Sequence, residues 1–245
     1  MRFPRWQSIQ FVRYALTLVL IALLASLALE GQASAGAVTT QSVLKLAKSA
    51  IAAQSGVHVV FVADFKPSSV RENLVADVGG TGGSESVTEG KEVLVVRVDS
   101  SFGYVRGSQS GLTTLFGLSS KQAKALGTRW ESWKVGTNQY VNLKADVTLA
   151  AVKALLPKSV GTKLSTEIVN GSKSYVLKWT AAASGSQPAL ANMLTLSAGT
   201  FLPTRATTTA SSGVKLTTNL SRWGERVQVS APPAGSIRTS SSIGR

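Results

Sequence analysis

The chain contains no cysteine and only one histidine among its 245 residues. The absence of cysteine excludes disulfide bonds, thiolate metal sites and thiol nucleophiles. A single histidine also excludes the common zinc centres, which use several histidine ligands. Most hydrolytic and redox chemistries are therefore excluded or difficult to assemble from these residue types.

The start of the chain has the organisation of a signal peptide. Three arginines accompany an apolar run of 16 residues, 14–29, and Ala-Ser-Ala at residues 33–35 supplies a small-residue cleavage site. Because a bilayer core requires roughly 20 apolar residues, we predict that residues 1–35 are a signal peptide cleaved after Ala35. A retained N-terminal anchor is the alternative. In both cases the protein is expected to be exported, either secreted or held in the cell envelope.

Basic residues outnumber acidic ones by 26 to 12, which gives a formal net charge of +14. The signal segment carries +2 of this charge, so residues 36–245 keep +12. The basic residues are dispersed and have tryptophans between them, a pattern that nucleic-acid-binding proteins also show. Because we expect the protein to be exported, we expect an anionic membrane surface or a cell-wall polyanion as partner, and no nucleic acid. A basic surface that serves only solubility is the alternative.

One amphipathic helix precedes a strand-rich region. The helix is predicted from about residue 41 to Gln54, and its apolar stripe contains Val43, Leu46, Ala47, Ala50 and Ile51. From Val57 onward the hydrophobic period changes to two, which predicts about ten short strands. These strands cover residues 57–65, 69–78, 92–98, 102–106, 128–135, 163–169, 173–179, 193–196, 203–209, 214–220 and 227–229.

Turn and cap signals complete the predicted organisation. Asn170-Gly171 predicts a tight hairpin, and the glycine cluster at residues 79–83 predicts a hairpin tip. Helical pieces are expected at 110–117, at 119–126, and at 147–156 after a cap at Asp146. Successive strands with short turns favour an α+β fold with an antiparallel sheet. No linker or repeat interrupts a single domain at residues 36–234, and residues 235–245 are expected to form a disordered tail.

Several strands are apolar on both faces. Val60 and Val62 oppose Phe61, and Val93 opposes Leu94, whereas a sheet with one solvated face should alternate between apolar and polar residues. Either these strands are covered on both sides or one face lines an apolar cavity. The pattern leaves both interpretations open.

The residues offer no catalytic or metal-binding constellation. Ser42 and Lys45 match an S-x-x-K pattern without its companion motifs, so Ser42 is interpreted as a helix cap. His58 lies in the middle of a strand, and no G-x-S-x-G motif is present to supply a nucleophile. The scattered carboxylates do not have the spacing of a calcium loop. We therefore assign no catalytic residue, no metal ligand and no cofactor.

Three stretches together resemble the LppX/LprG/LprA/LprF group of actinobacterial envelope lipoproteins, which are relatives of the LolA/LolB lipoprotein carriers. The first is a strand pair at residues 93–106, which ends in FGYVR. The second, residues 125–133, has the sequence ALGTRWESW after a predicted helix. The third, residues 218–227, contains a Trp-Gly pair and precedes Pro232-Pro233. The order of these elements is similar over about residues 41–234.

This resemblance implies a strongly curved antiparallel sheet, a half-barrel, whose concave face is closed by helices over an apolar cavity. It also implies that acylated lipids or glycolipids bind in that cavity and are carried or presented in the envelope. The group usually has a cysteine for lipid attachment at the mature N-terminus, where this sequence has residues 33–36, Ala-Ser-Ala-Gly. A freely secreted or wall-associated protein is therefore expected rather than a lipid-tethered one.

The leading hypothesis is a non-enzymatic, monomeric lipid-binding protein with acyl chains in an apolar cavity. The alternative is a module of the same fold that has no cavity and binds a wall or membrane surface. Candidate cavity residues are apolar positions on one face of the predicted strands and on the predicted helices, although either strand face could be the inner one. They are Val59, Phe61, Leu94, Val96, Tyr104, Leu112, Leu115, Phe116 and Leu155.

Overall fold

The computed structural model describes residues 38–65, 71–183 and 188–239. The predicted signal peptide lies outside these described residues. Among the helices within them, none combines the length and the apolar character that a membrane crossing requires.

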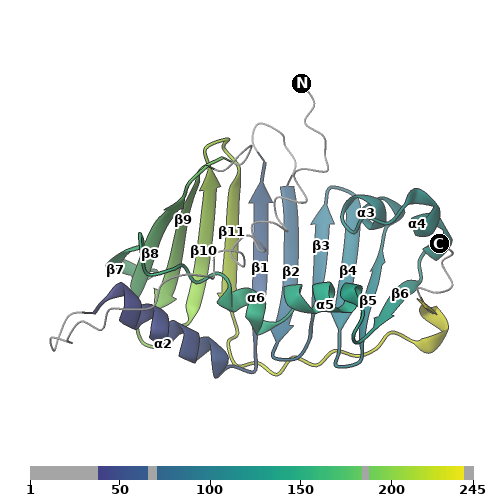
Figure 1. Cartoon of the computed structure of the whole chain (residues 1–245), viewed down its shortest axis with the longest axis horizontal. Coiled ribbons are helices and arrows are strands. Elements are labelled where there is room, and N and C mark those ends of the chain that lie inside the picture. The colour runs from purple at the N-terminus through teal and green to yellow at the C-terminus, as the bar shows by residue number, and fades with distance from the viewer. Residues whose placement is uncertain (1–37, 66–70, 184–187, 240–245) are drawn as a thin grey trace.

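The described chain forms one open sheet of twelve strands (Figure 1). The strands follow the order β12-β6-β5-β4-β3-β2-β1-β11-β10-β9-β8-β7, and all neighbours are antiparallel except β12 and β6. Their bounds are β1 (Gly56–Asp64), β2 (Arg71–Gly79), β3 (Gly83–Glu89), β4 (Glu92–Val98), β5 (Phe102–Gly107), β6 (Trp130–Lys134), β7 (Lys163–Val169), β8 (Ser172–Ala181), β9 (Leu190–Ser197), β10 (Pro203–Ala210), β11 (Lys215–Ser221) and β12 (Ile237–Thr239). The predicted α+β fold with a curved antiparallel sheet is confirmed.

Five α-helices pack against one face of this sheet, which we call the inner face (Figure 1). Helix α2 covers the β8–β9 end, α6 covers β1 and β2, and α3, α4 and α5 cover the β4–β6 end. Each helix contributes apolar side chains to one of three core clusters, whereas the opposite, outer face has no helix among the described residues. The helices are α2 (Thr40–Ala52), α3 (Gln109–Thr114), α4 (Ser120–Leu126), α5 (Asn138–Asp146) and α6 (Leu149–Lys153).

Local sequence signals account for several boundaries. The Thr39 hydroxyl accepts a hydrogen bond from the Ser42 backbone N–H, and the Ser42 side chain accepts one from the Thr39 N–H, so α2 begins with a capping box. The buried residues of α2 include Leu44 in place of Leu46, which is half-exposed and was wrongly included in the stripe. Asn170 and Gly171 adopt φ values of 51° and 76°, which confirms the predicted tight hairpin between β7 and β8.

The prediction of one helix over residues 147–156 was wrong. Asp146 is not a cap but the last residue of α5, and the short helix α6 begins after Thr148. Helix α5 was missed because its sequence is mostly polar and buries only Tyr140 and Leu143, so it shows no apolar stripe. The two short helices therefore cover different parts of the inner face, α5 at the β4–β6 end and α6 over β1 and β2.

The number and ends of the strands also differ from expectation. β3 was missed because Gly83–Glu89 alternates serine, threonine and glutamate with few apolar residues. Residues 227–229, expected as a strand, are not one; Val227 instead packs over Gly56, where a side chain would clash with it. Residues 237–239, assigned to the disordered tail, form β12 on the edge of β6.

Candidate functional site

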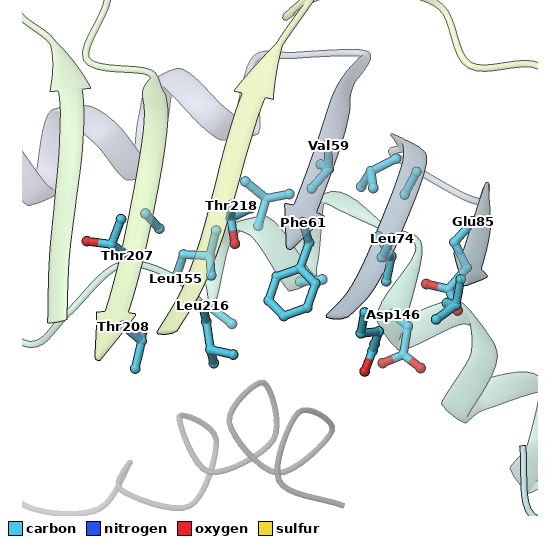
Figure 2. Close-up of a pocket in the computed structure, with 18 of the residues that line it drawn as sticks. Val59, Phe61, Leu74, Glu85, Asp146, Leu155, Thr207, Thr208, Leu216 and Thr218 are labelled. Carbon is cyan, nitrogen blue, oxygen red and sulfur yellow. The ribbon is translucent and has the colours of Figure 1, made fainter. Parts of the chain in front are cut away.

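A cavity of about 210 Å³ lies between the inner face of the sheet and helix α6 (Figure 2). It is partly open to solvent, and its walls come from strands β1 to β4 on one side and from β8 to β11 on the other. These strands are far apart in sequence. They become neighbours because β1 pairs with β11, which joins the two halves of the sheet.

Strand register builds the apolar wall of the cavity. Phe61 on β1 lies opposite Leu74 on β2, and Leu74 lies opposite Val87 on β3. Val59 lies opposite Ala76 in the next row along the same strands. Because side chains two residues apart share a face of a strand, these rows form one continuous apolar surface.

Helix α6 and the residues after it supply the roof. Val152 is buried in the core cluster formed with β1 and β2, and the partly buried Leu155 packs against that cluster. Both residues also line the cavity. The roof is fixed at one end by an isolated β-bridge between Thr148 and Gly79.

Polar groups line two sides of the cavity. Glu85 and Asp146 lie at the β2–β3 side, whereas Thr208 and Thr218 lie at the β10–β11 side (Figure 2). The Thr208 hydroxyl donates a 2.8 Å hydrogen bond to the side-chain oxygen of Asn192, which also lines the cavity. The cavity therefore offers both apolar surface and hydrogen-bonding groups.

The structure places five of the nine candidate cavity residues on this wall: Val59, Phe61, Leu94, Leu115 and Leu155. It also decides which strand face is inward, a choice that the hydrophobic pattern left open. The face that carries Phe61 is the inner one. The valines between these positions, including Val75 and Val93, belong to the outer face and are partly exposed.

The other four candidates do not line the cavity. Val96 and Leu112 are completely buried in the core cluster between α3 and the β4–β5 strands. Phe116 packs against the same cluster, and its ring centroid lies 5.4 Å from that of Trp133. Tyr104 lies on the outer face opposite Arg97, and its pKa is raised by burial and by the neighbouring Asp99.

Several cavity residues were not anticipated from the sequence. Leu74, Ala76 and Val78 follow the period of two along β2, so their inward position could have been inferred once Phe61 was known to face inward. Leu216 and Thr218 carry no such signal, because only the pairing of β11 with β1 brings them to the cavity.

A buried carboxyl group lies outside the cavity, under the β6 end of the inner face. Glu131 is 5% exposed and lies opposite Val105. Its Oε2 atom has no hydrogen-bond partner among the described residues. Burial raises the pKa of Glu131 to about 7, because the charged form loses its hydration there.

A cluster of ionisable groups on the outer face connects the C-terminal segment to the sheet. His58, Asp77 and Glu225 bring potential metal-ligand atoms within 4.8 Å of one another. The guanidinium of Arg222 lies among them, 3.1 Å from Asp77 Oδ1 and 3.4 Å from Glu225 Oε2, and it also contacts His58. The arginine already supplies the positive charge, so the cluster is a salt-bridge network and we assign no metal or catalytic role to it.

No protein-family model and no curated protein matches the chain. Similar solved structures include lipoprotein LppX from Mycobacterium tuberculosis, at 18% identity and a TM-score of 0.49, covering 78% of this chain and 98% of the other. LprF from Mycobacterium bovis is 15% identical with a TM-score of 0.47, covering 80% and 97%. A LolA superfamily protein from Nitrosomonas europaea is 14% identical with a TM-score of 0.27, covering 80% and 96%.

The names LppX and LprF also occur in the lipoprotein group that the sequence resembles. At these identities the similarity concerns the fold and transfers no ligand to this chain.

Proposed function

We propose that this chain is an exported, non-enzymatic lipid-binding protein that holds an acyl chain of a lipid or glycolipid in its cavity, for carriage or presentation in the cell envelope. The observation that supports this proposal is the apolar cavity between the inner face of the sheet and α6. Apolar surfaces of this kind favour hydrocarbon over water without any catalytic group.

The size of the cavity limits the ligand. An apolar protein cavity of about 150 Å³ accommodates benzene, so 210 Å³ corresponds to roughly eight carbon atoms of a chain. Burial of about eight methylene groups contributes on the order of 6 kcal/mol before the costs of binding. We therefore expect one acyl chain, or part of one, and not several chains enclosed together.

The proposal is tested by filling the cavity. Ala151 lies on α6 and lines the cavity, so Ala151→Phe places a ring where the acyl chain would lie. Calorimetric titration with 1-monodecanoylglycerol should show binding to the wild-type protein and at least a tenfold loss in the variant. Ala145→Phe, on the exposed side of α5, is the matched control and should bind normally. Equal binding by Ala151→Phe and the control would place the ligand elsewhere.

Association with an anionic surface is a second proposed function, and the outer face favours it. The strands contain ten Lys and Arg residues, of which the register places eight on the outer face. Only three acidic strand residues, Asp64, Asp77 and Glu167, share that face. The outer face is therefore strongly cationic and complements anionic lipid headgroups or a wall polyanion. The eight basic residues are Arg71, Arg97, Arg106, Lys134, Lys163, Lys178, Arg205 and Lys215.

A further inference from the structure

The outer face of the sheet carries a group of valines that the cavity does not explain. Val75 on β2 is 44% exposed and Val93 on β4 is 38% exposed, while Val60 on β1 and Val95 on β4 are half-buried. The helices of the described chain pack against the inner face, so they do not cover these side chains. A solvated strand face normally carries polar residues. We call these four residues the valine patch.

Strand register joins the valine patch to a basic residue in one row. Val60 lies opposite Val75, which lies opposite Ser86 on β3. Ser86 lies opposite Val95, and Val95 lies opposite Arg106 on β5. Because directly opposite side chains of neighbouring strands lie about 5 Å apart on the same face, this row continues from β1 to β5.

The basic end of the row holds two guanidinium groups against one indole. Trp130 on β6 precedes the outward-facing Ser132 by two residues and therefore shares its face. The guanidinium carbons of Arg97 and Arg106 lie 5.0 Å and 4.9 Å from the centre of the Trp130 ring, within the range of cation–π attraction. Trp130 is only 3% exposed, so both arginines are held next to a fixed ring.

The charge around the valine patch is positive. By register, every acidic residue of β3 to β6 lies on the inner face, whereas Arg97, Arg106 and Lys134 lie on the outer face. Asp77 is two residues from Val75 on the outer face of β2, and Arg222 pairs with it at 3.1 Å. Exposed apolar side chains therefore lie beside cations on one open surface.

This combination distinguishes between the anionic partners that the outer face could take. A hydrated wall polyanion offers no hydrocarbon against which exposed valines could be buried. A phospholipid surface offers phosphate groups and hydrocarbon directly beneath them, and binding to it strengthens with both buried apolar area and positive charge. The planar fork of an arginine side chain also matches the geometry of phosphate oxygens.

We propose that the outer face binds a phospholipid surface through the valine patch and the arginine pair. Arg97 and Arg106 contact headgroup phosphates, and Val75 and Val93 lie against the boundary of the hydrocarbon. This inference rests on the proposed association with an anionic surface, and it identifies that surface as a membrane.

The valine contact is tested by sedimentation with phosphatidylcholine vesicles that contain phosphatidylglycerol. Val75→Thr/Val93→Thr keeps the β-branched shape of both side chains but replaces one methyl group of each by a hydroxyl. It should bind the vesicles at least threefold more weakly than the wild-type protein and bind soluble polyphosphate equally well. The matched control Val141→Thr/Val160→Thr alters exposed valines outside the sheet and should bind both partners normally.

The phosphate contact is tested without a change in net charge. Arg97→Lys/Arg106→Lys removes the planar forks but keeps both positive charges. It should weaken vesicle binding at least threefold. The matched control Arg71→Lys/Arg205→Lys, at exposed positions of the same face, should have less than a twofold effect.

The outcomes separate the inference from the proposal on which it rests. If a double variant does not fold, as judged by circular dichroism, its two single variants should each show a smaller loss in the same direction. Vesicle binding that either test variant shares with its control, or an equal loss of polyphosphate binding in Val75→Thr/Val93→Thr, overturns the inference but leaves the association with an anionic surface intact. Failure of the wild-type protein to bind both vesicles and polyphosphate overturns both.

Discussion

At the scale of single residues, Glu131 shows how the tertiary structure alters the chemistry of one side chain. An ordinary glutamate is charged at neutral pH. Burial between β6 and the helices raises the pKa of Glu131 to about 7, so this side chain is largely protonated in the folded protein at pH 6. The unfolded chain, where the carboxyl is hydrated, releases the proton near pH 4.5.

The sign of the resulting stability change follows from proton counting. Between about pH 4.5 and about pH 7 the folded state binds more protons at Glu131 than the unfolded state does, so this residue lowers the free energy of unfolding as pH rises. The stability of Glu131→Gln relative to the wild-type protein should therefore be greater at pH 8 than at pH 4. The free energy difference between the two pH values should be about 3 kcal/mol at most, since one pKa unit corresponds to about 1.4 kcal/mol. Urea denaturation of both proteins at the two pH values measures this difference. The same advantage at pH 4 and pH 8 would contradict it.

At the scale of elements, the C-terminal segment joins both ends of the β1–β6 half of the sheet. Its start is held by the Arg222 salt bridges to Asp77 and Glu225. Its end adds β12 in parallel to β6, and Arg238 donates a 2.6 Å hydrogen bond to the carbonyl of Ala125. The segment thereby covers the edge of β6, whose backbone groups would otherwise be unpaired on that side.

Removal of residues 235–245 is expected to expose this edge. Because the backbone groups of Trp130, Glu131 and Ser132 pair with β12, local opening should become easier there and hydrogen exchange of the β6 amides should accelerate. The amides of β9, at the other end of the sheet, should exchange as in the full chain and serve as an internal control. Unchanged protection in β6 would show that β12 does not stabilise the edge.

The cap of α2 is a second test at this scale. Thr39→Ala removes the side-chain oxygen that accepts from the Ser42 N–H at 3.1 Å, and it should lower the free energy of unfolding by about 1 kcal/mol. Thr39→Ser keeps the acceptor and should behave like the wild-type protein. Chemical denaturation at one pH compares the three proteins, and an unaffected Thr39→Ala variant would show that the capping box contributes nothing measurable.

At the scale of the whole molecule, most basic strand residues and the cavity lie on opposite sides of one sheet. The outer face carries most of the strand cations, and the inner face holds the cavity under α6. One sheet can therefore present a cationic surface and an apolar binding site without either disturbing the other, because successive side chains of a strand point to opposite faces.

This arrangement predicts salt-sensitive binding to anionic vesicles through the outer face. Arg205→Glu/Lys215→Glu, on the exposed outer side of β10 and β11, should weaken binding at least tenfold, since each basic residue near such a surface contributes about 1 kcal/mol. Lys45→Glu/Lys48→Glu, on the exposed side of α2, changes the net charge equally and should have less than a twofold effect. Vesicle sedimentation measures both, and binding should fall as salt rises because charges are screened over about 8 Å. Equal losses in the two variants would show that net charge alone decides the binding.

Several features of this protein follow from the sequence alone, because they depend on residues close together in the chain. The period of two in β1 and the Asn170-Gly171 hairpin each predicted the correct local structure, whereas the N-cap of α2 is Thr39 and Ser42 completes its capping box from inside the helix. The alternation along β1 also placed Val59 and Phe61 on one face. Composition and charge excluded thiol chemistry and indicated a basic surface.

The tertiary structure alone decided which of these faces is inward and what shares the cavity with it. Phe61 meets Thr218 only because β1 pairs with β11, and these residues are separated by most of the described chain. The inward position of Glu85 depends on β3, whose polar sequence gives no strand signal by itself. Hydrophobic periodicity reports that a face is buried but not what covers it, so Val96 and Leu94 look identical in sequence although only Leu94 lines the cavity.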